Sequence, residues 1–177
     1  MLFRSSTYVY VDSLGQLKPL RFLSHVRHDG TASFDAKHHT WIYAKNYKVK
    51  FGEYSRTGIF FYDEATRNET AFPFNSKSYF VAQPYLSQTG DTLWFASDMP
   101  GTLGKSDIWY SVRKSGVWSQ PVNAGSKVNT FEEDMFPVVN GTDLYYSSEG
   151  KPGLGGMDID RKSTRLNSSH LVISYAV

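Results

Sequence analysis

The sequence contains no cysteine, which excludes disulfide-stabilised scaffolds, thiol catalysis and cysteine-ligated zinc sites. It has no apolar run approaching the roughly 18 residues that a membrane-spanning helix needs. The segment after Met1 lacks the charged and apolar regions of a secretory signal, and no stretch shows a sustained helical stripe of apolar residues. The chain as given therefore predicts no membrane span, no targeting segment and little helix.

A strong charge of either sign is also missing. The 177 residues include 19 Lys and Arg and 17 Asp and Glu, which gives a formal net charge of +2. Three of those basic residues lie after residue 160, so residues 1–160 hold 16 basic and 17 acidic residues. Binding to a nucleic-acid backbone requires a basic patch or stripe, and the sequence therefore predicts no nucleic-acid partner.

Aromatic and β-branched segments recur along the chain with a period of about 50 residues. One set consists of TWIYAKN (40–46), TLWFASD (92–98) and DLYYSSE (143–149). A second set aligns Tyr8, Ile59, Ile108 and Ile159, at spacings of 51, 49 and 51 residues. Gly, Asn, Asp and Ser separate the segments, as in turns, so each repeat contains about four short strands.

A repeated four-stranded unit of this length is typical of a β-propeller blade. We therefore expect an all-β fold, a partial β-propeller of about three blades made of antiparallel four-stranded sheets. Residues 1–160 form this domain, with blade ends near 22, 75 and 123. The alternative is a β-sandwich, which would not require a constant period.

The expected blades divide the chain as follows. The chain begins with the last two strands of one blade, near 6–11 and 16–22. Whole blades follow at about 31–75 and 83–123, and the first two or three strands of another blade come last. Within this alignment AFPFN (71–75) corresponds to SQPVN (119–123), which pairs Asn75 with Asn123.

The stretch GTLGKS (101–106) looks like the start of a phosphate-binding loop, but its context is wrong. The first glycine of such a loop would fall on Met99, and Pro100 removes another amide donor. A strand-like segment, DIWYSV, follows where a helix is required. We expect these glycines to serve a long connection between second and third strands, as do those of SEGKPGLGGMD (148–158), where Gly156 replaces Lys105.

The pieces ASDMPG, PVNAGSKVNT and EGKPGLGGMDI together resemble the WD40-like, TolB-type propeller repeats of OmpA-family outer-membrane proteins from Bacteroidetes-type bacteria. The likeness covers about residues 22–160 and is strongest to the subset associated with type IX secretion and peptidoglycan anchoring. One departure is SQTGDT (87–92), where the family has Ser-Pro-Asp-Gly: Thr89 lacks the carboxylate that closes the turn.

The resemblance implies a location in the periplasm, associated with the outer membrane, and partners among other cell-envelope proteins. Peptidoglycan would be bound only through an OmpA-like domain that this sequence does not contain. After Ile159 the repeat pattern fails, and RKSTRLNSSHLVISYAV (161–177) resembles an adapter-derived artefact of sequence assembly. We expect 161–177 to be a non-native tail, the alternative being that LVISYAV is a genuine strand.

Two groups of side chains are candidates for chemistry. His25, His28, His38 and His39 lie close in sequence, but neighbouring strand residues point to opposite faces, which argues against a shared metal. Acidic residues near turns could contact a partner or ligate calcium, although turn and solvent roles are commoner. The candidate loop and rim interaction residues are Asp98, Asp107, Glu133, Asp134 and Asp158, with Glu132 beside them.

Two classes of function remain. The favoured hypothesis is a non-catalytic scaffold, not an enzyme and without metal or cofactor, that binds proteins or a glycan. The alternative is a propeller fragment of a peptidase or glycosidase, which would need paired carboxylates near the propeller axis. The nucleophile-elbow and zinc-protease motifs G-x-S-x-G and H-E-x-x-H are both missing from the sequence.

Overall fold

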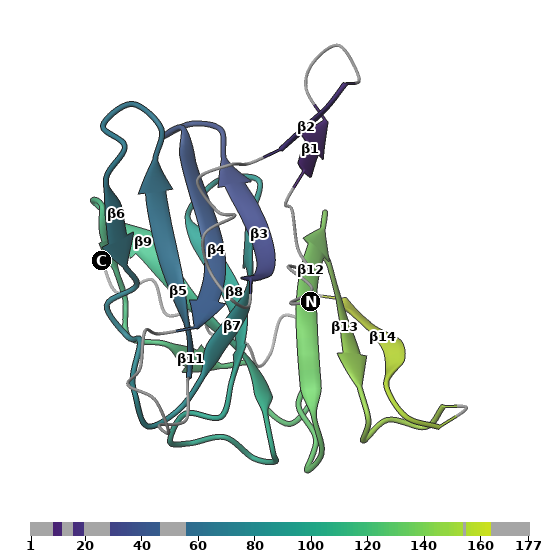
Figure 1. Ribbon diagram of the computed structural model, residues 1–177. Coiled ribbons are helices and arrows are strands. Elements are labelled where there is room, and N and C mark those ends of the chain that lie inside the picture. Colours follow the sequence, from purple (N-terminus) through teal and green to yellow (C-terminus); the bar gives the residue numbers. More distant parts are fainter. Residues whose placement is uncertain (1–8, 12–15, 20–28, 47–55, 154, 164–177) are drawn as a thin grey trace, which may run out of the picture.

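The computed structural model describes residues 9–11, 16–19, 29–46, 56–153 and 155–163, which form strands and turns with no helix among them (Figure 1). A short hairpin pairs β1 (Val9–Val11) with β2 (Leu17–Pro19). The first large sheet has the order β3 (Asp29–Asp35), β4 (Thr40–Asn46), β5 (Thr57–Asp63) and β6 (Glu69–Ala71). In the second, β7 (Val81–Leu86), β8 (Thr92–Ser97) and β9 (Asp107–Lys114) are joined by β10 (Val117–Trp118) and β11 (Val122–Asn123), which both pair with β9. The third contains β12 (Asp134–Asn140), β13 (Asp143–Ser148) and β14 (Asp158–Ser163).

All of these strand pairs are antiparallel, so the prediction of an all-β chain built from antiparallel sheets is confirmed. The two larger sheets begin at residues 29 and 81, two residues before their expected starts. The outermost strand of the second sheet is divided at residues 119–121, where its register against β9 shifts by one residue: Trp118 lies opposite Arg113, but Val122 lies opposite Tyr110. Ser119 bridges the gap: its N–H donates to Val112 O (2.8 Å), and its Oγ accepts from Val112 N (3.0 Å).

The three sheets share one register. Ile59 lies opposite Ala44, Ile108 opposite Ala96, and Ile159 opposite Ser147. The isoleucine positions that recur in the sequence therefore occupy the same place near the start of each third strand. The first strand of each sheet also has an irregularity in its pairing, at Asp29/Ala32, Ala82/Tyr85 and Met135/Val138.

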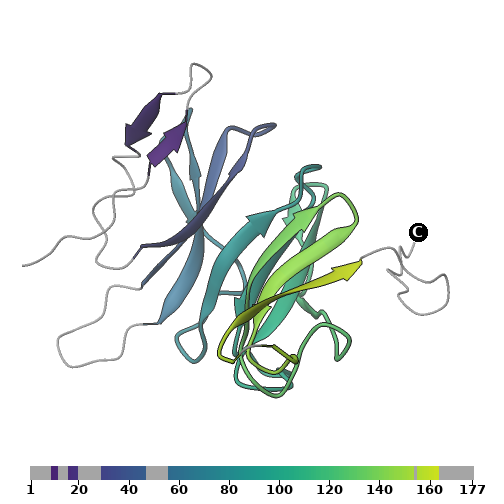
Figure 2. The same cartoon turned by 90° about the vertical axis from the view of Figure 1, so that its right-hand side faces the viewer.

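Successive sheets pack on one another in the same way, through the first strand of the later sheet. Strand β7 lies against β3, β4 and β5 of the preceding sheet, and β12 lies against β7, β8 and β9 of its preceding sheet. Figure 2 shows the three sheets following one another in this way. Polar contacts link first strands directly: Ser33 Oγ accepts from Leu86 N (3.1 Å), and Tyr85 Oη donates to Val139 O (2.5 Å).

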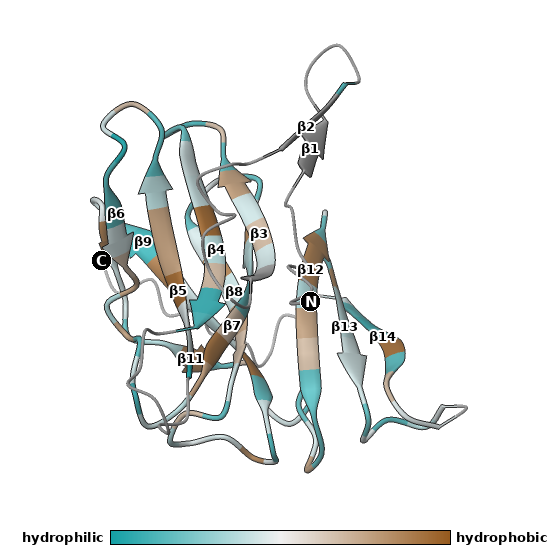
Figure 3. Ribbon diagram, in the orientation of Figure 1, coloured by the Kyte–Doolittle hydropathy of each residue, from teal (hydrophilic) through white to brown (hydrophobic). Residues whose placement is uncertain are grey.

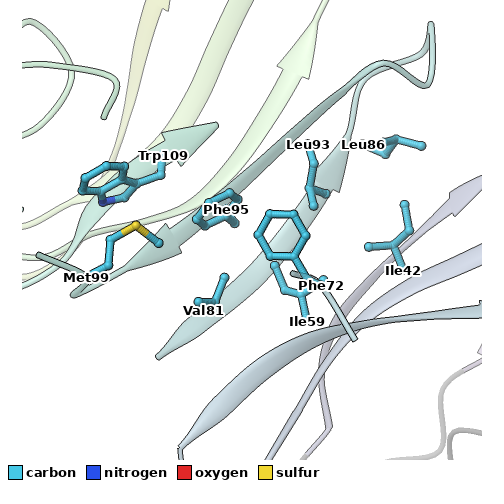
Figure 4. Packing of buried hydrophobic residues seen from close by; sticks show 9 residues of the cluster. All are labelled: Ile42, Ile59, Phe72, Val81, Leu86, Leu93, Phe95, Met99 and Trp109. Atoms are coloured by element: carbon cyan, nitrogen blue, oxygen red, sulfur yellow. The ribbon is translucent and has the colours of Figure 1, made fainter. Parts of the chain in front are cut away.

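Apolar side chains fill the space between sheets. Brown, hydrophobic segments in Figure 3 lie on the strands, and most of the turns are teal. One core cluster combines Ile42 and Ile59 of the first sheet with Val81, Leu93 and Phe95 of the second, around the ring of Phe72 (Figure 4). A second cluster joins the second and third sheets, and its buried members are Ala96, Ile108, Val128, Leu144 and Tyr146.

Aromatic residues of the repeated strands lie within and between the sheets. Phe95, Trp109 and Tyr146 are buried, and Tyr85, Trp94 and Tyr145 are half-buried. Aromatic rings bury large areas, so their placement within and between sheets supplies much of the hydrophobic stabilisation.

The turn that departs from the resembled family closes in another way. Asp91 Oδ1 accepts hydrogen bonds from the hydroxyls of Ser87 (3.0 Å) and Thr89 (2.7 Å), while Gly90 takes a positive φ of 74°. Burial alone would raise the pKa of Asp91, but these hydroxyl groups outweigh it and hold the pKa below its ordinary value. The carboxylate missing at position 89 is therefore supplied two residues later.

An asparagine amide completes the third strand of each larger sheet. Asn75 Oδ1 accepts from Ile59 N (2.9 Å), and Asn75 Nδ2 donates to Ile59 O (2.6 Å). Asn129 makes the same two bonds with Ile108, at 2.8 and 3.0 Å. The sequence alignment of Asn75 with Asn123 was therefore wrong, because Asn129 is the residue that makes the bonds of Asn75. A turn closed by Gly125 O places extra residues before Asn129.

This asparagine bridge generates a stability prediction. Replacing Asn129 with leucine leaves the buried N–H of Ile108 without this partner, while the C=O of Ile108 keeps its bond from Ala124 N (3.0 Å), and we expect a loss of about 1–3 kcal/mol in the free energy of unfolding. Asn140→Leu, at the exposed end of β12, is the matched control and should change stability by less than about 0.5 kcal/mol. Urea unfolding of both variants measures the difference, and equal midpoints would contradict the structural role.

An ion pair also joins the first two sheets, at the end where their tight turns lie. Arg113 Nη2 donates to Asp35 Oδ2 (2.6 Å) and to Gly90 O (2.5 Å), and Asp35 is only 2% exposed. His38 Nδ1 lies 2.8 Å from the same carboxylate oxygen. Burial alone would raise the pKa of Asp35, but the hydrogen bonds from Arg113 and His38 outweigh it and lower the pKa.

The lowered pKa makes this part of the stability dependent on pH. The ionised carboxylate stabilises the fold fully above its unfolded pKa of about 3.9, and the contribution is lost as pH falls through the lower folded value. We expect Asp35→Asn to cost about 2–4 kcal/mol at pH 7. Denaturation curves between pH 7 and 2.5 should show native and variant stabilities converging only below about pH 4; a constant difference would contradict the ion pair.

Strand β14 extends past the point where the repeat pattern fails. Arg161 and Ser163 lie opposite Tyr145 and Asp143 of β13, and Tyr146 Oη donates to Asp160 Oδ2 (2.7 Å). Residues 164–177, which include LVISYAV, lie outside the described residues. The expectation that 161–177 is foreign to the protein therefore stays a prediction.

Candidate functional site

Three long connections meet at the end of the sheets opposite the Asp35–Arg113 pair. They are residues 98–106 between β8 and β9, residues 124–133 between β11 and β12, and residues 149–157 between β13 and β14. Asp134 N donates to Ser106 O, and Glu149 N donates to Glu133 O, each at 3.0 Å. We call this region the loop end.

The two glycines of GTLGKS are needed at the loop end for different reasons. Gly101 takes a φ of 100°, which favours glycine. Gly104 lies against the backbone of the next connection, and a Cβ there would stand 2.5 Å from the carbonyl carbon of Phe131 and 2.6 Å from Thr130 O. The segment leads into strand β9 and not into a helix, which agrees with the expectation that GTLGKS is not a phosphate-binding loop.

Two of the five candidate acidic residues are buried and hold the connections in place. Asp107 accepts from Leu103 N (2.8 Å) and Asn123 Nδ2 (2.6 Å), and it is 0% exposed. Asp134, also 0% exposed, accepts from both the N–H (2.6 Å) and the hydroxyl (2.9 Å) of Thr130. Their observed contacts are thus with the protein's own backbone and side chains.

The other three candidates lie nearer the surface. Asp98 accepts from Phe80 N (2.7 Å) and lies 3.6 Å from Arg56 Nη1. Glu133 is half-buried, and Asp158 is half-buried beside Gly153 at the start of β14. A partner-binding role for the five residues stays a prediction, with Asp98, Glu133 and Asp158 as the members that reach solvent.

An exposed apolar pair at the loop end was missed by sequence reasoning. Phe131 is 82% exposed and Leu103 is 44% exposed. Their connections touch, since Gly104 packs on the Phe131 backbone. Lys105 Nζ pairs with Glu132 Oε2 (2.5 Å) beside them, and this carboxylate raises the pKa of Lys105. The available signal was a phenylalanine inside an otherwise polar connection, NTFEED.

Phe131 stands on a well-anchored backbone. Asp134 holds Thr130 on one side, and Thr130 Oγ1 accepts from Glu132 N (3.2 Å) on the other. Asn129 is held by Ile108 as described above. An exposed aromatic side chain on a fixed backbone loses little conformational entropy when it binds, which suits recognition of a protein surface.

The histidines do not come together as a metal site in the part of the chain that is described. His25 and His28 lie outside the described residues, His38 contacts Asp35, and the His39 ring packs edge-on against Phe34. Among the described residues no three His, Asp or Glu side chains are placed to share a metal ion. These same residues also include no helix of the length and hydrophobicity that crossing a membrane requires.

The chain matches no protein-family model, and no curated protein matches it either.

The close contact at Gly104 generates a prediction that separates a structural glycine from a nucleotide-binding one. Gly104→Ala forces backbone of two connections apart, and we expect a loss of about 1–3 kcal/mol in stability. Lys105→Ala, one residue away and exposed, removes only a surface ion pair and should leave stability nearly unchanged. Thermal unfolding of the two variants is the measurement. A larger effect at Lys105 than at Gly104 would show that the contact is misassigned.

Proposed function

We propose that the chain is a slice of a β-propeller that acts as a non-catalytic scaffold for protein–protein interaction in the bacterial cell envelope. The observation that carries the proposal is the repeated packing step, in which β7 covers β3–β5 and β12 covers β7–β9. In a β-propeller, each antiparallel sheet packs on the preceding one in the same way, and the first strands of neighbouring sheets lie in contact around the central axis.

The loop end is the part of the scaffold that we assign to partner binding. It contains the exposed Phe131 and Leu103, with charged side chains around them. The pieces that most specifically resemble the OmpA-family propeller repeats, ASDMPG, PVNAGSKVNT and EGKPGLGGMDI, lie at or next to this end. The resemblance supports a periplasmic, outer-membrane-associated location and partners among other envelope proteins.

The geometry of the buried acids supports a scaffold over a hydrolase fragment. A glycosidase needs two carboxyl groups that face a substrate at a defined separation. Asp107 and Asp134 instead accept hydrogen bonds from their own loops and are closed to solvent. Their arrangement fits carboxylates that position a binding surface.

A binding experiment tests the proposal. The chain, Phe131→Asp and Val117→Asp are each cross-linked to the envelope fraction of a Bacteroidetes-type bacterium, and captured proteins are quantified. Val117, 71% exposed on β10 away from the loop end, is the control. We expect Phe131→Asp to reduce specific capture about tenfold and Val117→Asp to leave it unchanged. Equal capture by all three, or turnover of peptidase or glycosidase substrates, would contradict the scaffold function.

A further inference from the structure

The sequence contains one Asn-Gly pair, Asn140-Gly141, and it lies in the turn that joins β12 to β13 (Figure 1). Asn140 lies opposite Asp143, so Gly141 and Thr142 form a two-residue hairpin turn. Gly141 takes a φ of 60°, a conformation that glycine adopts readily. The turn is at the opposite end of the third sheet from the loop end, so it is independent of the proposed binding surface.

Both residues of the pair are open to solvent. Asn140 and Gly141 are exposed, and a Cβ built on Gly141 would meet no atom within 4 Å beyond its chain neighbours. Gly141 has no side chain of its own to shield its backbone nitrogen. The approach of the Asn140 side-chain amide to that nitrogen is therefore not hindered by surrounding atoms.

Other asparagines of the chain are held in place. The Asn129 side chain bonds both backbone groups of Ile108, and Asn129 is only 3% exposed. The next residue is Thr130, whose β-branched side chain crowds its backbone nitrogen. Asn75 is held in the same way by Ile59. Neither amide can turn toward the following backbone nitrogen without breaking two hydrogen bonds.

We propose that Asn140-Gly141 is a site of spontaneous deamidation and isomerisation. A base removes the amide proton of Gly141, the Gly141 nitrogen attacks Asn140 Cγ, and the Cγ–Nδ2 bond breaks. The side-chain nitrogen takes up a proton and leaves as ammonia, and a five-membered succinimide ring remains.

Water then opens the ring at one of its two carbonyl carbons. Breaking the bond from the Gly141 nitrogen to Asn140 Cγ gives aspartate. Breaking the bond from the same nitrogen to the main-chain carbonyl carbon of Asn140 gives isoaspartate, in which the main chain runs through Cγ. The net reaction consumes one water and releases one ammonia, and nothing is oxidised or reduced.

The two products act differently on the structure. Isoaspartate adds one carbon to the main chain beside Val139, whose carbonyl oxygen accepts from Tyr85 Oη (2.5 Å) of the preceding sheet. It therefore disturbs a contact between sheets. Aspartate leaves the main chain unchanged and adds a negative charge opposite Asp143, whose carboxylate lies 3.7 Å from Arg161 Nη1.

Peptide mapping by mass spectrometry tests the site. The folded full chain is incubated in mildly alkaline buffer, and the conversion of amide to acid is followed at each asparagine. We expect Asn140 to convert at least about tenfold faster than Asn129, because Asn129 must first be released by local unfolding. Isoaspartate should be found at position 140 by labelling with an isoaspartyl methyltransferase. Conversion no faster than that of Asn129, or aspartate without isoaspartate, would overturn the proposal.

Two variants serve as controls. Gly141→Ala places a methyl group beside the attacking nitrogen and should slow conversion of Asn140 about tenfold. Because a positive φ strains alanine, Asn140→Gln is compared as well: glutamine would need a six-membered ring, and rapid conversion at position 140 should disappear. An unchanged rate in either variant, with circular dichroism showing the native fold, would contradict the succinimide route.

Thermal unfolding tests the structural consequence. The deamidated chain is separated from the native chain by ion exchange and compared with Asn140→Asp, which carries the same charge on an unaltered main chain. We expect the isoaspartate-containing fraction to unfold at a lower temperature than Asn140→Asp, and Asn140→Asp to unfold close to the native chain. Equal midpoints for the isoaspartate-containing fraction and Asn140→Asp would show that the altered main chain does not reach the contact at Tyr85.

Discussion

Closure of the third strand around its isoleucine is the interaction on which the rest of the structure depends. The side chains of Ile59 and Ile108 are buried between one sheet and the next, and an asparagine amide satisfies the backbone of each. Hydrophobic burial and hydrogen bonding therefore act on the same residue. If either failed, the sheet would lose its contact with its neighbour and the edge would hold unpaired polar groups.

The same closing segment links the fold to the proposed binding surface. Asn129 ends the second sheet, Thr130 is held by Asp134, and Phe131 then projects into solvent. Gly104 allows the neighbouring connection to approach this backbone closely. The position of the exposed aromatic residue thus depends on contacts that also hold successive sheets together, which ties recognition to stability.

Buried acids in this protein have positioning roles in several places. Asp107 and Asp134 hold connections at the loop end, and Asp35 accepts from Arg113 at the opposite end. Each carboxylate has at least two donors, which offsets the free energy of removing a charge from water. The described part of the chain contains no helix, and its long connections lie outside the strands, so side-chain bonds of this kind hold them in place.

Local patterns were sufficient to predict the antiparallel strands, the recurrence of the isoleucines and the rejection of a phosphate loop at GTLGKS. Strand and turn preferences act over a few residues, so a short stretch such as DIWYSV carries its own signal. Such patterns could not identify Asn129 as the counterpart of Asn75, because the equivalence depends on the turn at Gly125. Nor could they pair Asp35 with Arg113, 78 residues away, or show that Phe131 is exposed while Asp134 is buried. Those outcomes were decided only when one sheet packed on the next, since packing determines which distant groups meet and which are left facing solvent.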